Sequence, residues 1–204
     1  MRICNFFRAS GLAGALLVTA AFTQRAEGSI IMNISQVGTN VVITASGSIN
    51  LSALTLIGQS TSTGNIVPNS GWANAGPAGV LEDVYDGVPG SFGISGQLLS
   101  FGSGPESIES SGSGNLFGID QIFIAVPHGY ISKAPLSGSA TFNATTLAGL
   151  GITPGTYVST WGTGPTADSW TLNAGTPEPG SLSLIAAGLL LAGLRMRRRA
   201  ARSI

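Results

Sequence analysis

Residues 41–46 read Val-Val-Ile-Thr-Ala-Ser, and this alternation of apolar and polar side chains decides the fold class. In an extended chain successive side chains point to opposite faces. Val41, Ile43 and Ala45 therefore share one face, and the residues between them share the other. Because β-branched residues also favour the extended conformation, the segment predicts a half-buried strand.

Similar short runs recur along the chain and are separated by glycine-rich turns. Residues 122–126, Ile-Phe-Ile-Ala-Val, are apolar throughout and predict a central strand. A loop rich in Gly-Ser pairs at 103–115 is expected to be mobile, and residues 145–150 are expected to form one helical turn. Further strands are expected at 54–57, 98–101, 136–142, 156–161 and 169–172, the last of them after a turn at 162–165.

Residues 29–175 show no long amphipathic helix and no repeat of fixed period. Many short antiparallel strands joined by Gly, Ser and Pro turns are typical of two packed sheets. The sequence therefore predicts an all-β fold, a β-sandwich or jelly-roll-like domain. An N-terminal signal helix and a C-terminal transmembrane helix are expected to flank it.

The composition indicates one domain that has no disulfide bonds. The chain has 204 residues, which suits a single domain of about 100–200 residues. Only 9% of the residues are charged and 30 are glycine, which favours turns and strands over surface helices. The single cysteine, Cys4, lies in the leader, so the domain could form no disulfide and must be stabilised by an apolar core.

The basic residues gather at the two ends of the chain. Between residues 29 and 176, Lys133 is the one basic residue beside seven acidic ones, which gives a net charge of −6. Proteins that bind nucleic acid need Lys and Arg to neutralise phosphates. The central domain should therefore be repelled by nucleic acid and by anionic lipid, and nucleic-acid binding is excluded.

Residues 1–28 have the three parts of a secretory signal peptide. Two arginines occur in the first eight residues, an apolar run covers 11–23, and Ala26-Glu27-Gly28 has the small-x-small pattern that signal peptidase accepts. The apolar run is shorter than the roughly 20 residues that a membrane span needs. Signal peptidase is therefore expected to cleave between Gly28 and Ser29 during export.

Residues 176–204 combine a motif, an apolar span and a basic end. Pro177-Glu178-Pro179 interrupts regular structure, because two prolines fix φ and remove two amide donors. Residues 180–194 as a helix would extend about 22 Å, less than the hydrocarbon core of about 30 Å, and local thinning can relieve this mismatch. The positive-inside rule keeps the basic cluster cytoplasmic and the central domain outside. That cluster comprises Arg195, Arg197, Arg198, Arg199 and Arg202.

These three parts, in this order, resemble the PEP-CTERM sorting tail of exported Gram-negative proteins. The resemblance implies processing by an exosortase, a membrane-embedded cysteine protease expected to cut near the Pro-Glu-Pro motif. It also implies transient anchoring in the inner membrane and then delivery to the cell surface or matrix of a biofilm-forming, exopolysaccharide-producing bacterium. Residues 154–172 look like the closing hairpin common just upstream of this motif, and they carry no known activity with them.

The chain is therefore expected to have three parts: a signal peptide at 1–28, a β-rich exported domain at 29–175 and the sorting tail at 176–204. Few residues of the exported domain suggest catalysis. His128 is the only histidine, and because Pro127 and Gly129 flank it, it is interpreted as a turn residue that cannot form a zinc site. No Gly-x-Ser-x-Gly motif follows a strand and precedes a helix, as one class of serine hydrolase requires. No catalytic, cofactor-binding or metal-binding residue is predicted.

Glu82, Asp83 and Asp86 form the densest acidic cluster of the domain. Carboxylates at this spacing could bind Ca²⁺ or act as a catalytic pair. The Asp-x-Asp-x-Asp-Gly pattern of a calcium loop is absent, however. A solvated turn is therefore the preferred interpretation.

Exposed aromatic side chains could stack on sugar rings, although burial in the core is the favoured interpretation for each candidate. The candidates are Trp72, Tyr85, Tyr130 and Trp161. The expected function is that of a non-catalytic protein of the envelope or biofilm matrix, with exopolysaccharide as its expected partner. One alternative is a carbohydrate-binding or ice-binding module, although the regular Thr-x-Thr array that would distinguish such a module is absent. The other is a secreted hydrolase, which would need convergent carboxylates among Asp83, Asp86, Asp120 and Asp168.

Overall fold

The computed structural model describes residues 28–88 and 100–175, and these residues form two β-sheets joined by turns and three short 3-10 helices. The all-β prediction is confirmed. The signal helix, the Pro-Glu-Pro motif, the apolar span and the arginine cluster lie outside the described residues, apart from Gly28 and Ser29 at the signal's end. Within the described ranges, no helix has the length and apolar character needed to cross a membrane.

The first sheet has six strands in the order β12-β13-β1-β2-β11-β8. Neighbouring strands are antiparallel, except that the first described strand, β1, lies parallel to the last, β13. The hairpin of β12 and β13 confirms the closing hairpin predicted from residues 154–172. The strands are β1 (Ser29–Val37), β2 (Asn40–Ser48), β8 (Ser111–Gly114), β11 (Pro135–Phe142), β12 (Gly155–Trp161) and β13 (Asp168–Ala174).

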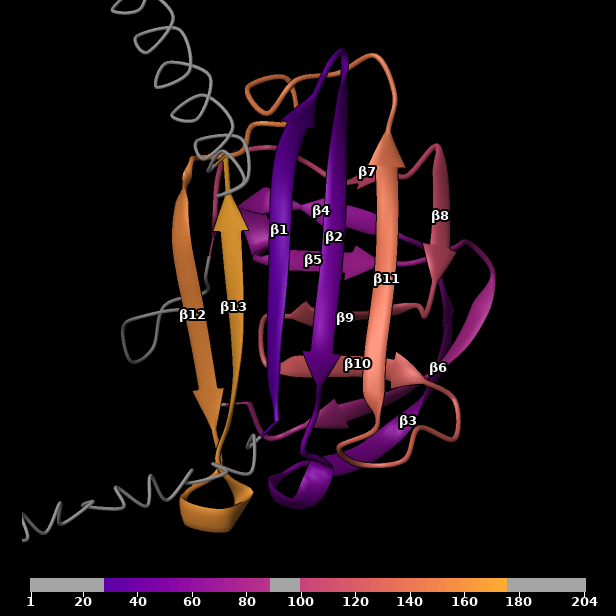
Figure 1. The fold of residues 1–204 in the computed structure, drawn as a ribbon, viewed down its shortest axis with the longest axis vertical. Coiled ribbons are helices and arrows are strands. Elements are labelled where there is room, and N and C mark those ends of the chain that lie inside the picture. Colours follow the sequence, from indigo (N-terminus) through magenta and orange to yellow (C-terminus); the bar gives the residue numbers. More distant parts are fainter. Residues whose placement is uncertain (1–27, 89–99, 176–204) are drawn as a thin grey trace, which may run out of the picture.

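The second sheet has seven strands in the order β3-β6-β10-β9-β5-β4-β7, and all neighbours in it are antiparallel. Its strands cross behind those of the first sheet in Figure 1. They are β3 (Thr55–Ser62), β4 (Asn65–Val67), β5 (Trp72–Ala75), β6 (Val80–Asp86), β7 (Ser107–Ile108), β9 (Phe117–Asp120) and β10 (Phe123–Pro127). The 3-10 helices are η1 (Leu51–Ala53), η2 (Pro68–Ser70) and η3 (Gly164–Thr166).

The core lies between the two sheets and is made of the inward-facing residues of both. Strand β2 follows the predicted alternation, since Val41, Ile43 and Ala45 are buried while Thr44 and Ser46 are exposed. The rings of Phe117 and Trp170 meet across the sheets with their centroids 5.9 Å apart. Other core residues are Ile30, Met32, Ile34, Ile66, Ala73, Ile119, Ile124, Val126, Trp161 and Leu172.

The prediction of a mobile loop at 103–115 is wrong. Strand β7 pairs with β4, and strand β8 pairs with β11 in register from Ser111 to Gly114. The Gly-Ser pairs suit this position, because the Cβ that a side chain would add at Gly112 comes 2.0 Å from the Gly76 carbonyl oxygen. Small residues therefore allow close backbone packing here rather than disorder.

Two smaller predictions have different outcomes. Residues 100 and 101 of the strand expected at 98–101 lie in a bend, where Phe101 is buried in the core, and residues 98 and 99 lie outside the described residues. The helical turn predicted at 145–150 is confirmed, since the Leu150 amide donates to the Thr146 carbonyl at 2.9 Å and closes a single turn.

Candidate ligand pocket

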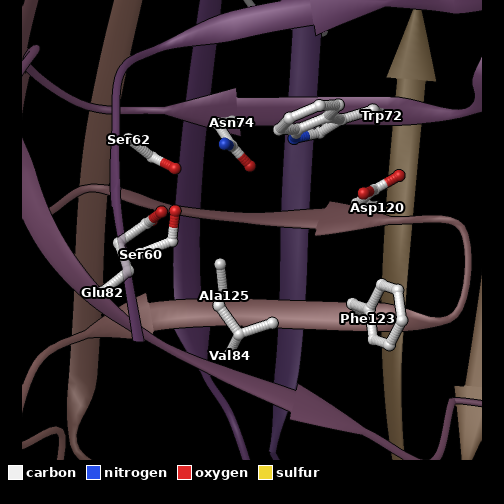
Figure 2. A pocket seen from close by; sticks show the side chains of 9 residues that line it. All are labelled: Ser60, Ser62, Trp72, Asn74, Glu82, Val84, Asp120, Phe123 and Ala125. Atoms are coloured by element: carbon white, nitrogen blue, oxygen red, sulfur yellow. The ribbon is translucent and has the colours of Figure 1, made fainter. Parts of the chain in front are cut away.

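The seven-stranded sheet carries a pocket on its outer face, away from the six-stranded sheet. Along β10, Ile124 and Val126 point into the core, so Phe123 and Ala125 point outward. The pocket has a volume of about 160 Å³, below the roughly 300–1,000 Å³ of pockets for drug-sized ligands, so it suits a small ring or a single functional group. Figure 2 shows its lining residues: Ser60, Ser62, Trp72, Asn74, Glu82, Val84, Asp120, Phe123 and Ala125.

One end of the pocket is aromatic. Trp72 on β5 lies opposite Asp120 on β9, and Asp120 lies opposite Phe123 on β10. Directly opposed residues point to the same face of a sheet, so these three side chains form one cross-strand row (Figure 2). Burial raises the pKa of the Asp120 carboxyl above its ordinary value. The row therefore places a carboxyl group between two aromatic rings.

The other end of the pocket is polar and is built around Glu82. Its register partner on β3 is Ser60, and Ser62 and Asn74 lie at the same end in Figure 2. Glu82 is 0% exposed, and burial raises the pKa of its carboxyl from 4.5 to about 7, an effect that the nearby Ser62 hydroxyl opposes. The Ser62 hydroxyl is close enough to act on the carboxyl, but neither Glu82 oxygen has a partner of full hydrogen-bond geometry among the described residues.

The Asn74 side chain lies over the neighbouring strand, β9, where a glycine leaves space for it. It lies opposite Gly118 on β9, and a Cβ at Gly118 would come 1.6 Å from the Asn74 Oδ1 atom. Only glycine therefore leaves room for the amide. The Asn74 Oδ1 atom is buried and, like the Glu82 oxygens, has no hydrogen-bond partner among the described residues.

The interpretation of Glu82, Asp83 and Asp86 as a solvated turn is wrong. All three lie on β6, where Glu82 and Asp86 point to the outer face while Asp83, opposite the core residue Val126, points to the inner one. Glu82 and Asp83 are both buried. Alternation along the strand thus separates neighbours in the sequence, and the described ranges contain no group of three acidic, His or Cys side chains placed to share a metal ion.

His128 lies in a turn, as predicted, and also pairs with Asp83. Its Nδ1 atom is 2.8 Å from the Asp83 Oδ1 atom, and the Gly129 amide donates to Asp83 Oδ2 at 2.9 Å. These two contacts hold the pKa of the Asp83 carboxyl below its ordinary value. The Gln59 side chain also donates to Asp83 Oδ1, at 3.1 Å. Within the described residues, the His128 ring Nδ1 atom lies within hydrogen-bond distance of Asp83 and Gln59 and of no serine, and the His128 amide donates to the Leu81 carbonyl at 3.1 Å, so these contacts fix the turn to β3 and β6.

The four carboxylates considered for a hydrolase do not converge. Asp83 is held by His128, and Asp168 accepts a hydrogen bond from the Asn50 amide beside the six-stranded sheet. Asp86 and Asp120 lie in the same cross-strand row but on either side of Phe123, and Asp86 does not line the pocket. Glu82, which did not stand out from its neighbours in the sequence, is the acidic residue that the fold brings into the pocket beside Asp120.

The aromatic candidates separate into two groups. Trp161 is buried as expected, and Tyr85 and Tyr130 are half-buried against the core. For Trp72 the expectation of core burial is wrong, because its side chain lies on the outer face and lines the pocket. Aromatic rings, carboxyl groups, an amide and hydroxyls together can bind a polar ligand that has one apolar face. No protein-family model, curated protein or solved structure was found to match this chain.

Proposed function

We propose that this chain is an exported, non-catalytic protein of the Gram-negative envelope or biofilm matrix whose domain binds exopolysaccharide in the pocket of the seven-stranded sheet. An exosortase sorts it through the Pro-Glu-Pro tail. The domain is of the jelly-roll type of β-sandwich, presenting one broad sheet face to its ligand. The observation that carries the binding function is the row of Trp72, Asp120 and Phe123 on that face.

The pocket combines the two kinds of group that a sugar ring requires. The C–H face of a pyranose is apolar and packs on an aromatic ring, which Trp72 and Phe123 supply on the outer face. Its hydroxyl groups need hydrogen-bond partners, which Asp120, Glu82 and Asn74 supply. A flat aromatic surface beside fixed acceptors therefore favours a saccharide over a purely apolar ligand.

The two acidic residues of the pocket lie at its opposite ends. Asp120 lies opposite Phe123 and Glu82 lies opposite Pro127 on the strand between them. Four residues along β10 and two strand spacings place the Cα atoms of Glu82 and Asp120 about 16 Å apart. Figure 2 shows the two residues at opposite ends of the pocket, which suits contacts to two parts of one ligand.

The sorting part of the proposal rests on the two chain ends and is tested by the mature termini. The full chain would be expressed in a Gram-negative host with an exosortase and in the isogenic deletion, and intact-protein mass spectrometry would be applied to each product. We expect the protein to begin at Ser29 in both strains and to lose its arginine cluster only when the exosortase is present. Equal survival of the tail in both strains would contradict the sorting proposal.

The binding part predicts a large effect of one outer-face substitution. The mature protein should co-sediment with at least one of cellulose, chitin and chitosan, and Trp72→Ala should weaken that binding about ten-fold or more, because it removes the stacking surface. Val158→Ala is the matched control, since Val158 is exposed on the other sheet. A wild-type protein that binds none of the three, or a Trp72→Ala protein that binds as well as wild type, would rule out the proposed site.

A further inference from the structure

The polar end of the pocket contains buried hydrogen-bond acceptors that have no partner of full hydrogen-bond geometry among the described residues. Both carboxyl oxygens of Glu82 and the Oδ1 atom of Asn74 are buried without a partner. An unsatisfied buried polar atom costs about 1–3 kcal/mol, so such atoms are rare unless something else binds them. The two carboxyl oxygens of Glu82 at one end of the pocket therefore indicate a ligand group that brings donors.

The negative charge of the pocket indicates which kind of ligand group can bind there. Its lining has two carboxyl groups and no basic residue, and the described domain has Lys133 as its only Lys or Arg. An acidic sugar would add a negative charge with nothing to neutralise it. A cationic group, in contrast, would offset the cost of burying an ionised Glu82.

We infer that the Glu82 end of the pocket binds a primary ammonium group, so that the preferred ligand is an amino sugar with a free amine. The inference rests on the proposed carbohydrate-binding function and names the sugar class that the site selects. An ammonium has three N–H donors and no acceptor, so it can donate to both Glu82 oxygens, and its charge offsets that of the ionised carboxyl. A single hydroxyl has one donor and no charge, so it would leave the buried carboxylate without a counter-charge.

The same geometry explains how the ring and the amine could bind together. Trp72 and Phe123 lie at the far end of the pocket from Glu82 (Figure 2), so one sugar unit can stack there while the amine of a neighbouring unit lies against the carboxyl. Because the ammonium favours the ionised carboxyl, binding should release the proton that Glu82 holds when the pocket is empty. N-acetylation removes both the charge and two of the three donors.

The test compares three soluble β-1,4-linked oligosaccharides of equal length, made of glucosamine, N-acetylglucosamine or glucose, by isothermal titration calorimetry with the mature protein. We expect the glucosamine oligomer to bind at least about ten-fold more tightly than the other two, with proton release detected as a dependence on buffer ionisation enthalpy. Glu82→Gln should abolish both the preference and the proton release, and Asp86→Asn, on the same strand face outside the pocket, should keep both.

Each outcome decides between the two proposals. Equal affinities for glucosamine and glucose oligomers, both lost in Trp72→Ala, would overturn the ammonium site and leave carbohydrate binding intact. Binding of the glucosamine oligomer that requires added Ca²⁺ and is lost with a chelator would place a metal ion beside Glu82 and would also overturn the inference. If no oligomer binds and Trp72→Ala changes nothing, both proposals fail.

Discussion

Replacing Trp170 with alanine is expected to lower the free energy of unfolding by about 3–5 kcal/mol, the range observed when a large aromatic side chain is removed from a core. Trp170 is 0% exposed and packs on Phe117 of the opposite sheet. The domain has no disulfide that could compensate, because the one cysteine precedes it. Urea unfolding of the mature protein, followed by circular dichroism, measures the difference.

A second substitution at this position separates packing from hydrogen bonding. The Trp170 indole N–H has no hydrogen-bond partner among the described residues, so Trp170→Phe removes no bond and keeps most of the contact with Phe117. We expect it to cost well under half as much as Trp170→Ala. If the two variants lose equal stability, or if Trp170→Ala loses less than about 1 kcal/mol, the two sheets are not held together through this residue.

Glu82→Gln is expected to remove a strong pH dependence of stability. The native carboxyl has a pKa of about 7, raised from 4.5 by burial. Between these values the folded protein keeps a proton that the unfolded chain has lost, so wild-type stability falls as the pH rises. The protonated Glu82 carboxyl stabilises the fold fully at a pH below its pKa in the unfolded chain. This stabilisation is lost as the pH rises through its pKa in the folded protein. Once the pH exceeds the pKa of Glu82 in the folded protein, the free energy of unfolding has fallen by about 3 kcal/mol in total.

The comparison needs unfolding curves for both proteins at about pH 4 and about pH 8. At the lower pH the two should be similarly stable, because protonated Glu and Gln are both neutral; at the higher pH the variant should be the more stable. Asp120, whose pKa burial also raises, contributes equally to both proteins, so it cancels in the difference. A wild-type protein that gains stability relative to Glu82→Gln as the pH rises would show that Glu82 is not buried.

Local pattern predicted several strands but not β1, although its residues also alternate between the two faces. Strands β2, β10, β11, β12 and β13 were all expected, since each has alternating or wholly apolar residues next to glycine or proline turns. Strand β8 was missed because Ser-Gly-Ser-Gly has no apolar face, and only its partner β11 determines its structure. Composition cannot distinguish a flexible glycine-rich loop from a glycine-rich strand when tertiary pairing decides between them.

The pocket was harder to predict than the fold, because five different strands contribute to it. Trp72-Ala73-Asn74-Ala75 shows the one local signal that could have been used: small buried alanines alternate with large polar or aromatic residues. That pattern indicates a strand with a functional outer face. The burial of Glu82 depends on its cross-strand neighbours, so the acidic cluster appeared to be a solvated turn when only the sequence was considered.

The most direct test of the account is the intrinsic fluorescence of the mature protein during titration with the glucosamine oligomer. The protein has three tryptophans; Trp161 and Trp170 are buried in the core, and Trp72 lines the pocket. Stacking of a sugar on Trp72 should change the emission of the wild-type protein, and Trp72→Phe should abolish that change while keeping binding measurable by calorimetry, because an aromatic ring remains. An emission change that persists in Trp72→Phe, or binding that leaves the wild-type emission unaltered, would place the ligand somewhere other than this pocket.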